Sequence, residues 1–406
     1  MAECREQNCI EFQCSIRGRC GRQLEVEKRN LPGTTSGTCG SSEYFSSRIQ
    51  TMIEKERDFP SELEFRTASA KCHWTEVGPE LLPQDTDVAN LKESWKNRSL
   101  CFVENGICLG RKIGEGGQAD IFEAFFQKRN VNLIAKVFKE RDSLSSLLHR
   151  CPTHIFQFEG DCKYIIRIIA GVILNCVEDL SLHGRFAFLM FRYQDDLRSV
   201  IDKNMMRNSN GGVPPFEASK AFRYMIEIAC GMKILHSKQT LHRDLKASNI
   251  LVWLRTDEPG SGDDEEFYCA IADYECSIGV FGTTFWRAPE VLKALQDRRQ
   301  PEFTTKVDVY SYAMTCYEIL TGLVPFEDYC KSDYSVVIGG ERPELPGDVN
   351  IHMRELLNRC WHAIPDERPE FSEIVEIVGL IMTMELNVPQ EIVETLKKPR
   401  PDYLYS

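Results

Sequence analysis

The pattern of apolar and polar positions changes near residue 107 of this 406-residue chain. Before that point, apolar residues are scattered among Ser, Gly, Thr and charged residues, without a long periodic pattern. After it, short apolar runs separated by turn residues predict successive strands, at 107–113, 121–126, 131–138, 164–172 and 186–193. The chain therefore begins its folded domain as a β-meander.

Helical periodicity dominates the second half of the domain. Apolar residues recur at helical spacing at Phe222, Met225, Ile226, Ile228, Ala229, Met232, Ile234 and Leu235. A buried strand, Ile250–Leu254, is expected next, and a later helix is expected to run through Leu320. Strands followed by helices predict an α+β fold.

A polar loop at 241–249 interrupts the apolar frame between the first predicted helix and the strand after it. It presents Asp244, Lys246 and Asn249, which supply a carboxylate able to act as a base, a cation and an amide oxygen. Loops held on a packed scaffold commonly carry function. The loop is therefore the first candidate for catalytic chemistry.

A glycine-rich turn at 114–119 joins two predicted strands. A Rossmann or Walker loop needs a helix after its glycines, so neither is predicted here. Small residues in such a hairpin let backbone N–H groups approach phosphate oxygens closely. Lys136 follows on an apolar strand, where its ammonium needs a partner or an exposed edge. Phosphates would be such a partner.

Several motifs in order resemble those of protein kinases. The H-R-D-L-x-x-x-N pattern at 242–249 resembles the kinase catalytic loop. Gly114 and Gly116 resemble the kinase glycine-rich loop, with Ala119 in place of its third glycine, and Lys136 matches the lysine of V-A-I-K.

The second half of the chain extends the resemblance. Residues 282–290 are similar to G-T-x-x-W-x-A-P-E, and Asp273 stands where kinases carry the D-F-G aspartate. Lys246 with Gly282-Thr283 resembles the serine/threonine class, and the ending at 360–371 resembles its tyrosine-kinase-like group.

This resemblance implies a two-lobed kinase fold, with a small β-rich N-lobe and a larger α-helical C-lobe, over residues 107–385. A largely irregular extension at 1–100 and a tail at 386–406 flank it. The resemblance also implies that Asp308 supports the catalytic-loop backbone and that Arg368 pairs with Glu290.

The site residues follow from the same resemblance, with ATP and Mg²⁺ as cofactors and a protein Ser/Thr hydroxyl as acceptor. Asp244 is expected to be the catalytic base, assisted by Lys246 and Thr283. Mg²⁺ is expected on Asn249 and Asp273. The ATP-binding residues are expected to be Ile113, Gly114, Glu115, Gly116, Gly117, Gln118, Ala119, Ile121 and Lys136.

Three departures from the family pattern support an alternative function. Glu275 replaces the D-F-G glycine, and the segment from Asp273 to Glu290 is short. The helix glutamate that pairs with the nucleotide lysine has no clear counterpart, since Glu140 lies close after Lys136 and Glu159 late. The alternative is a pseudokinase that acts as a scaffold or signalling switch with weak or no phosphotransfer.

Composition limits the remaining classes of function and location. The net charge of −12 argues against a nucleic-acid-binding protein, which needs a basic face. No uncharged apolar run is long enough to span a membrane, and no signal-peptide pattern opens the chain. Because neither a signal peptide nor a membrane span is expected, the 17 scattered cysteines are interpreted as reduced thiols, and a cytoplasmic location is expected.

The extension and one insertion carry weaker signals. Cys4, Cys9, Cys14 and Cys20 lack the tight pairs typical of zinc sites. Residues 44–57 predict a short amphipathic helix whose apolar side needs a partner, and a regulatory protein partner for 1–100 stays open. The acidic stretch at 255–266 is interpreted as a solvated hairpin insertion, with a partner-docking loop as the alternative.

Overall fold

The computed structural model describes residues 101–103, 107–126, 129–139, 163–166, 168–174, 180–182, 184–207, 213–254, 267–275, 277–330 and 333–398. The expected helix at 44–57, the acidic stretch at 255–266 and the two glutamates considered for Lys136 (Glu140 and Glu159) lie outside these residues.

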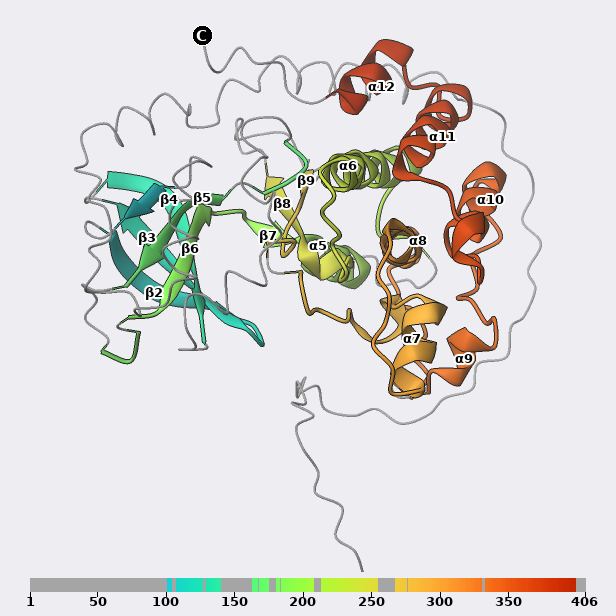
Figure 1. Ribbon diagram of the computed structural model, residues 1–406. Helices are drawn as coiled ribbons and strands as arrows, with labels where there is room; N and C mark the ends of the chain where they lie inside the picture. Colours follow the sequence, from blue (N-terminus) through green and yellow to red (C-terminus); the bar gives the residue numbers. More distant parts are fainter. Residues whose placement is uncertain are drawn as a thin grey trace, which may run out of the picture. The chain divides into compact units, whose positions relative to one another are not determined.

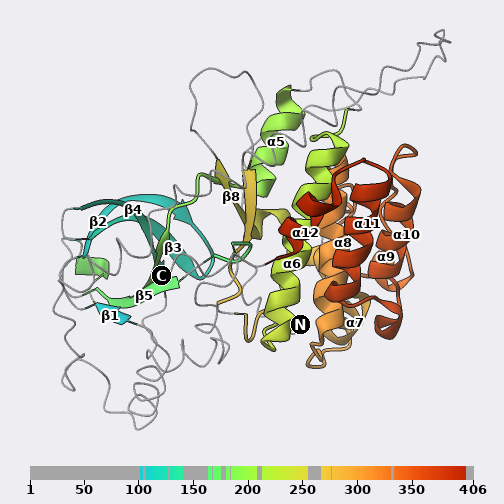
Figure 2. The ribbon, with the colours of Figure 1, turned by 90° about the horizontal axis from the view of Figure 1, so that it is seen from above.

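A six-stranded sheet forms the N-lobe, in the order β1-β5-β6-β4-β3-β2 (Figures 1 and 2). Its strands are β1 (Cys101–Val103), β2 (Ile107–Glu115), β3 (Ala119–Phe126), β4 (Arg129–Phe138), β5 (Ile168–Ile173) and β6 (Phe186–Phe191). The meander β2-β3-β4 is antiparallel, as the glycine turn predicts, whereas β1 pairs with β5 in parallel. Four of the predicted strands are thus confirmed to within two residues.

The strand expected at 164–172 is wrong over its first residues, because β5 begins only at Ile168. Tyr164 and Ile166 instead bond to a C-lobe strand: the Ile271 amide donates to Tyr164 O at 2.8 Å, and the Ile166 amide donates to Ile271 O at 2.9 Å. The apolar run is therefore shared between two sheets.

Helices make up the C-lobe. They are α5 (Leu197–Arg207), α6 (Ala218–Ser237), α7 (Pro289–Gln296), α8 (Thr305–Thr321), α9 (Ser335–Ile338), α10 (Ile351–Cys360), α11 (Phe371–Met384) and α12 (Gln390–Lys397). Most residues of α6 and of α8 are buried. The long helix α6 packs against α8, α11 and α12 (Figure 2). The predicted α+β kinase architecture, with a β-sheet N-lobe and a helical C-lobe, is confirmed.

A second, three-stranded sheet carries the polar loop. Its strands are β7 (Asp195–Asp196), β8 (Ile250–Leu254) and β9 (Phe267–Ile271), in that order. Residues Ile250 and Ile271 lie opposite each other in the antiparallel pair β8-β9. The segments before β8 and after β9 therefore meet at one edge of this sheet.

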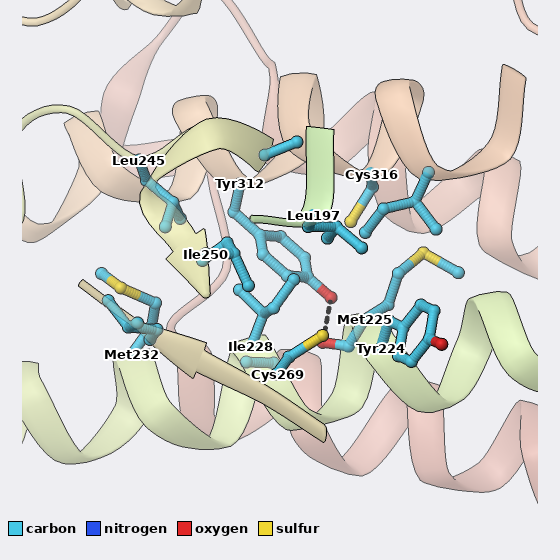
Figure 3. Close-up of a cluster of buried hydrophobic side chains, with 14 of the residues drawn as sticks. Leu197, Tyr224, Met225, Ile228, Met232, Leu245, Ile250, Cys269, Tyr312 and Cys316 are labelled. Atoms are coloured by element: carbon cyan, nitrogen blue, oxygen red, sulfur yellow. Dashed lines mark hydrogen bonds between the residues drawn. The ribbon is translucent and has the colours of Figure 1, made fainter. Parts of the chain in front are cut away.

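The core below the loop is apolar and closely packed. Leu245 in the middle of the loop and Ile250 directly after it belong to the same buried cluster as Tyr312 of α8 (Figure 3). The Tyr312 hydroxyl donates to Met225 O at 3.0 Å, which satisfies its polar end. Gly231 of α6 lies so close to the neighbouring segments that a Cβ there would come within 2.7 Å of Tyr164 O. The loop thus rests on a rigid base.

The region interpreted as a tail at 386–406 contains the helix α12, whose Ile392, Val393 and Leu396 are buried. The buried Tyr164 hydroxyl donates to Leu396 O at 2.9 Å, so this helix is bonded to the segment before β5. Among the described residues, none of the helices has both the length and the apolarity needed to cross a membrane.

Candidate active site

The loop between α6 and β8 carries Asp244 and Lys246, and both contact Thr283 from the segment between β9 and α7. Thr283 Oγ1 donates to Asp244 Oδ1 at 2.6 Å, and Lys246 Nζ lies 3.0 Å from Asp244 Oδ2. Lys246 Nζ also donates to Thr283 Oγ1 at 2.6 Å. A hydroxyl, an ammonium and a carboxylate from two distant segments therefore form one closed network.

Asn249 joins this network from the 3₁₀ turn η4 (Ala247–Asn249). Its Nδ2 donates to the Asp244 backbone oxygen at 2.7 Å and to Asp244 Oδ2 at 3.2 Å. The three residues picked from the loop sequence thus lie together, with the Asp244 side chain in a fixed orientation.

Asp308 of α8 accepts hydrogen bonds from the backbone of the 241–249 loop. Its carboxylate accepts hydrogen bonds from the backbone amides of His242 at 2.9 Å and Arg243 at 2.7 Å, and contacts His236 Nε2 at 2.8 Å. Arg243 has a positive φ of 67°, a strained conformation that such bonds can maintain. The contact expected between Asp308 and the catalytic-loop backbone is present.

Burial alone would raise the pKa of Asp308, but the hydrogen bond to His236, the charges of the two histidines and the Arg243 amide outweigh burial and lower it. We expect Asp308→Asn to lower the free energy of unfolding by about 2–4 kcal/mol at neutral pH, because an amide NH₂ would face N–H donors. Urea unfolding measures this loss.

The pH dependence of that loss has a definite sign. A depressed folded-state pKa adds stability above the unfolded-state pKa of about 3.9, and this stability is lost as the pH falls through the folded value. The difference in the free energy of unfolding between wild type and Asp308→Asn should therefore decrease only below about pH 4. A matched change at the half-exposed Asp202, which pairs with Arg198 on α5, should cost under about 1 kcal/mol at every pH.

Glu318 of α8 is a positioning residue that the sequence did not reveal. Its buried carboxylate accepts from the Ala247 backbone amide at 3.1 Å, from Trp286 Nε1 at 2.9 Å and from Arg198 Nη1 at 3.2 Å. It thereby joins the catalytic loop, the segment after Thr283 and α5. Burial raises the pKa of Glu318, against the opposing effect of these partners. The only sign of this role in the sequence is that Glu318 is the one glutamate in the mostly apolar helix α8.

Gly282 makes the approach of Thr283 to Asp244 sterically feasible. Its φ is +81°, and a Cβ there would come within 2.8 Å of Arg243 O. Only glycine meets both demands without displacing the loop. The G-T pair therefore has a structural reason in addition to its chemistry.

Asn249 and Asp273 place an amide and a carboxylate at one edge of the small sheet. The Ala272 amide donates to Asn249 O at 2.9 Å, which fixes the two segments side by side. Because Asn249 Nδ2 donates to Asp244, its Oδ1 is the atom left for a cation. Asp273 Oδ2 makes no hydrogen bond within the described residues. A carboxylate and an amide oxygen suit Mg²⁺, so the residues present fit this ion.

Lys136 lies on the central strand β4, opposite Ile121 of β3 and Phe188 of β6. Its Nζ donates to Asp273 Oδ1 at 2.8 Å and also to Glu275 Oε1. Burial alone would lower the pKa of Lys136, but the charges of Asp273 and Glu275 outweigh burial and raise it. The Lys136 charge in turn lowers the pKa of Asp273. The ammonium is thus charged and held beside the predicted metal ligand.

The glycine-rich hairpin has the predicted form. The Gly116 amide donates to Ala119 O at 2.8 Å, closing the turn between β2 and β3. Ala119 is buried, and its methyl group belongs to the core cluster with Phe138 and Phe188, so it does not obstruct the turn. Gly117 has open space where a Cβ would stand.

The other hairpin residues differ in where their side chains lie. Glu115 pairs with Lys112 at 2.9 Å and with Lys139 at 3.1 Å, so its carboxylate contacts lysines of the N-lobe itself. Ile113, Gln118 and Glu115 are exposed, while Gly114 lies opposite Ile121. Within the described residues no hydrogen bond joins this hairpin to the Asp244 loop.

The turn at Asp273-Tyr274-Glu275 replaces the family's D-F-G. Asp273 has a positive φ of 63°. Tyr274 is buried, as expected for an aromatic in the phenylalanine position, and its hydroxyl donates to Ile166 O at 2.8 Å. This bond, which phenylalanine lacks, fixes the turn to the segment before β5. Sequence reasoning did not foresee where Glu275 points.

Comparison with known proteins agrees with this geometry. The model of the protein tyrosine and serine/threonine kinase family matches residues 107–378. The chain is 25% identical over 285 residues to the serine/threonine/tyrosine-protein kinase HT1 of Arabidopsis thaliana, a match that covers 66% of this chain and 65% of that protein.

Two further relatives carry different acceptor classes in their names. The serine/threonine-protein kinase STY46 of Arabidopsis thaliana is 34% identical over 40% of this chain and 27% of its own length. The tyrosine-protein kinase receptor TYRO3 of Danio rerio is 26% identical over 75% of this chain and 35% of its own length. The chain thus spans less than two thirds of these relatives. The family match covers well over half of the chain, which therefore belongs to the protein tyrosine and serine/threonine kinases.

Proposed function

We propose that this protein kinase transfers the γ-phosphoryl group of Mg-ATP to serine and threonine hydroxyls of protein substrates. One observation carries the proposal: Asp244, Lys246 and Thr283 form a closed hydrogen-bonded network. Asp244 and the Lys246–Thr283 contact match the pattern by which the sequence resembles serine/threonine kinases. The names of the relatives include both acceptor classes, so the acceptor is part of the proposal.

In the proposed reaction, the substrate hydroxyl oxygen forms a bond to the γ-phosphorus while the bond to the β,γ-bridging oxygen breaks and ADP leaves. Asp244 orients the hydroxyl and accepts its proton. Lys246, whose ammonium is already fixed by Asp244 and Thr283, stabilises negative charge on the transferring group.

The chain's other residues bind and orient the nucleotide. Asn249 and Asp273 would hold Mg²⁺, which when bound neutralises charge on the β- and γ-phosphates. Lys136 and the backbone amides of the 114–119 hairpin would contact the phosphates. In this mechanism positioning and electrostatics supply nearly all of the catalysis.

The acceptor class can be tested with two peptide pools, one containing only serine and threonine acceptors and one containing only tyrosine. With radiolabelled Mg-ATP, we expect wild type to label the first pool at least about tenfold faster. EDTA should abolish the label in both. Faster labelling of the tyrosine pool would overturn the proposed specificity. Label in neither pool would favour the pseudokinase alternative.

A further inference from the structure

Glu275 stands where the family carries glycine, and its side chain is fully buried, with 0% exposed. Its Oε1 accepts a hydrogen bond from Lys136 Nζ. Its Oε2 is buried and has no hydrogen-bond partner among the described residues. Lys136 is thus the cation in the described structure that offsets the Glu275 charge. Burying a charge with a single hydrogen-bond partner costs free energy.

The two carboxylates on Lys136 lie in different environments. The Asp273 side chain is 53% exposed, whereas Glu275 is closed off from solvent. A nucleotide approaching from the solvent side would therefore meet the exposed Asp273 before it could meet the buried Glu275. Glu275 therefore contacts the Lys136 ammonium from its buried side.

Lys136 keeps capacity for a phosphate in this arrangement. An ammonium group has three protons to donate, and here one goes to Asp273 and one to Glu275. Within the described residues the third proton has no acceptor, and it can be donated to a phosphate oxygen. The Tyr274 hydroxyl bond to Ile166 O fixes the turn that carries both carboxylates. The geometry is therefore pre-organised, which lowers the ordering cost of binding.

We propose that Glu275 is the positioning residue that holds Lys136 in its nucleotide-binding orientation, a task that the family gives to a helix glutamate. Glu275, which departs from the family pattern in the sequence, thereby becomes part of the site. The inference rests on the proposed function in one respect, because it assumes that Lys136 binds the phosphates of Mg-ATP.

Four proteins test the proposal: wild type, Glu275→Gln, Lys136→Met and the double variant. Their dissociation constants for Mg-ATP can be measured by calorimetry, without any phosphotransfer. Glu275→Gln should weaken binding by about tenfold, since it removes the charge that holds the lysine. In the Lys136→Met background the same change should alter the constant by less than about twofold, because no ammonium remains to position.

Two further variants separate positioning from stability. Glu227→Gln is the matched control: Glu227 is also fully buried and pairs with Arg223 at 2.9 Å, outside the proposed site. It should lower the melting temperature and leave Mg-ATP affinity unchanged. Should Glu275→Gln fail to fold, Glu275→Gly restores the family residue without a buried amide, and the same loss of affinity is expected.

Several outcomes would overturn the inference. Unchanged or tighter Mg-ATP binding by Glu275→Gln would show that Glu275 is neutral or competes with the phosphates. An equal loss in both backgrounds would show a purely structural role, and a wild type that binds no Mg-ATP would remove the premise. Suppose that Glu275→Gln weakens Mg-ATP binding only when Lys136 is present, and that wild type transfers no phosphate. That result would overturn the proposed function and leave the positioning role of Glu275 intact.

Discussion

Replacing Asp244 by asparagine is expected to lower kcat by about 10²–10⁴-fold and to leave the dissociation constant for Mg-ATP within about threefold of wild type. The amide has nearly the size of the carboxylate, but it neither accepts the substrate proton nor carries the charge that fixes Lys246. Steady-state kinetics and calorimetry on the same preparation would separate the two effects.

The fold of that variant needs its own control. Asp244 Oδ1 accepts from Thr283 and Asp244 Oδ2 contacts Lys246, so an amide there changes the local network as well. Asp202→Asn, on the exposed surface of α5, makes the same chemical change outside the site. It should leave kcat unchanged and cost under about 1 kcal/mol of stability. A comparable fall in kcat in the two variants would mean that Asp244 has no special part in the chemistry.

Arg368→Ala is expected to lower the free energy of unfolding by about 3–5 kcal/mol. The Arg368 guanidinium is buried and makes a bidentate pair with Glu290, at 2.7 and 2.8 Å, as the motifs predicted. It also donates to His362 O at 2.8 Å and to Lys306 O at 2.9 Å. Removing it leaves these acceptors and the Glu290 charge without their partner. Urea unfolding monitored by tryptophan fluorescence measures the change.

Arg359→Ala provides the matched comparison. Arg359 pairs with Glu373 between α10 and α11, and both side chains are about half exposed. Water screens that pair, so its loss should cost under about 1 kcal/mol. Equal destabilisation by the two arginine variants would contradict the assignment of Arg368 as a buried clamp on the segment that carries Glu290.

Sequence alone predicted those parts of the fold that local patterns specify. The glycine hairpin, the helix of residues 222–235 and the loop around Asp244 each follow from spacing and turn chemistry, and the structure confirms these elements. The strand expected at 164–172 was partly wrong for a physical reason. Its apolar residues are equally suited to either sheet, and the hydrogen bonds to Ile271 that decide the outcome are distant in sequence.

Site residues that belong to a family motif could be predicted from the sequence. Site residues whose role depends on contacts with distant groups could not. Asp244, Lys246 and Thr283 were chosen by their motifs, and the structure brings them together. Glu275 and Glu318 were not chosen, because their importance depends on which distant groups their buried carboxylates meet. A glutamate at a glycine position signals a departure, but only the structure shows that Lys136 is its partner.

Phosphoryl transfer by wild type and Asp244→Asn, measured side by side, tests the central claim most directly. Both proteins receive saturating radiolabelled Mg-ATP and the serine/threonine peptide pool, and the label in peptide is followed over time. The expected result is steady incorporation by wild type and at most about one hundredth of that rate with Asp244→Asn. Equal incorporation by the two proteins, or none by wild type, would contradict the account.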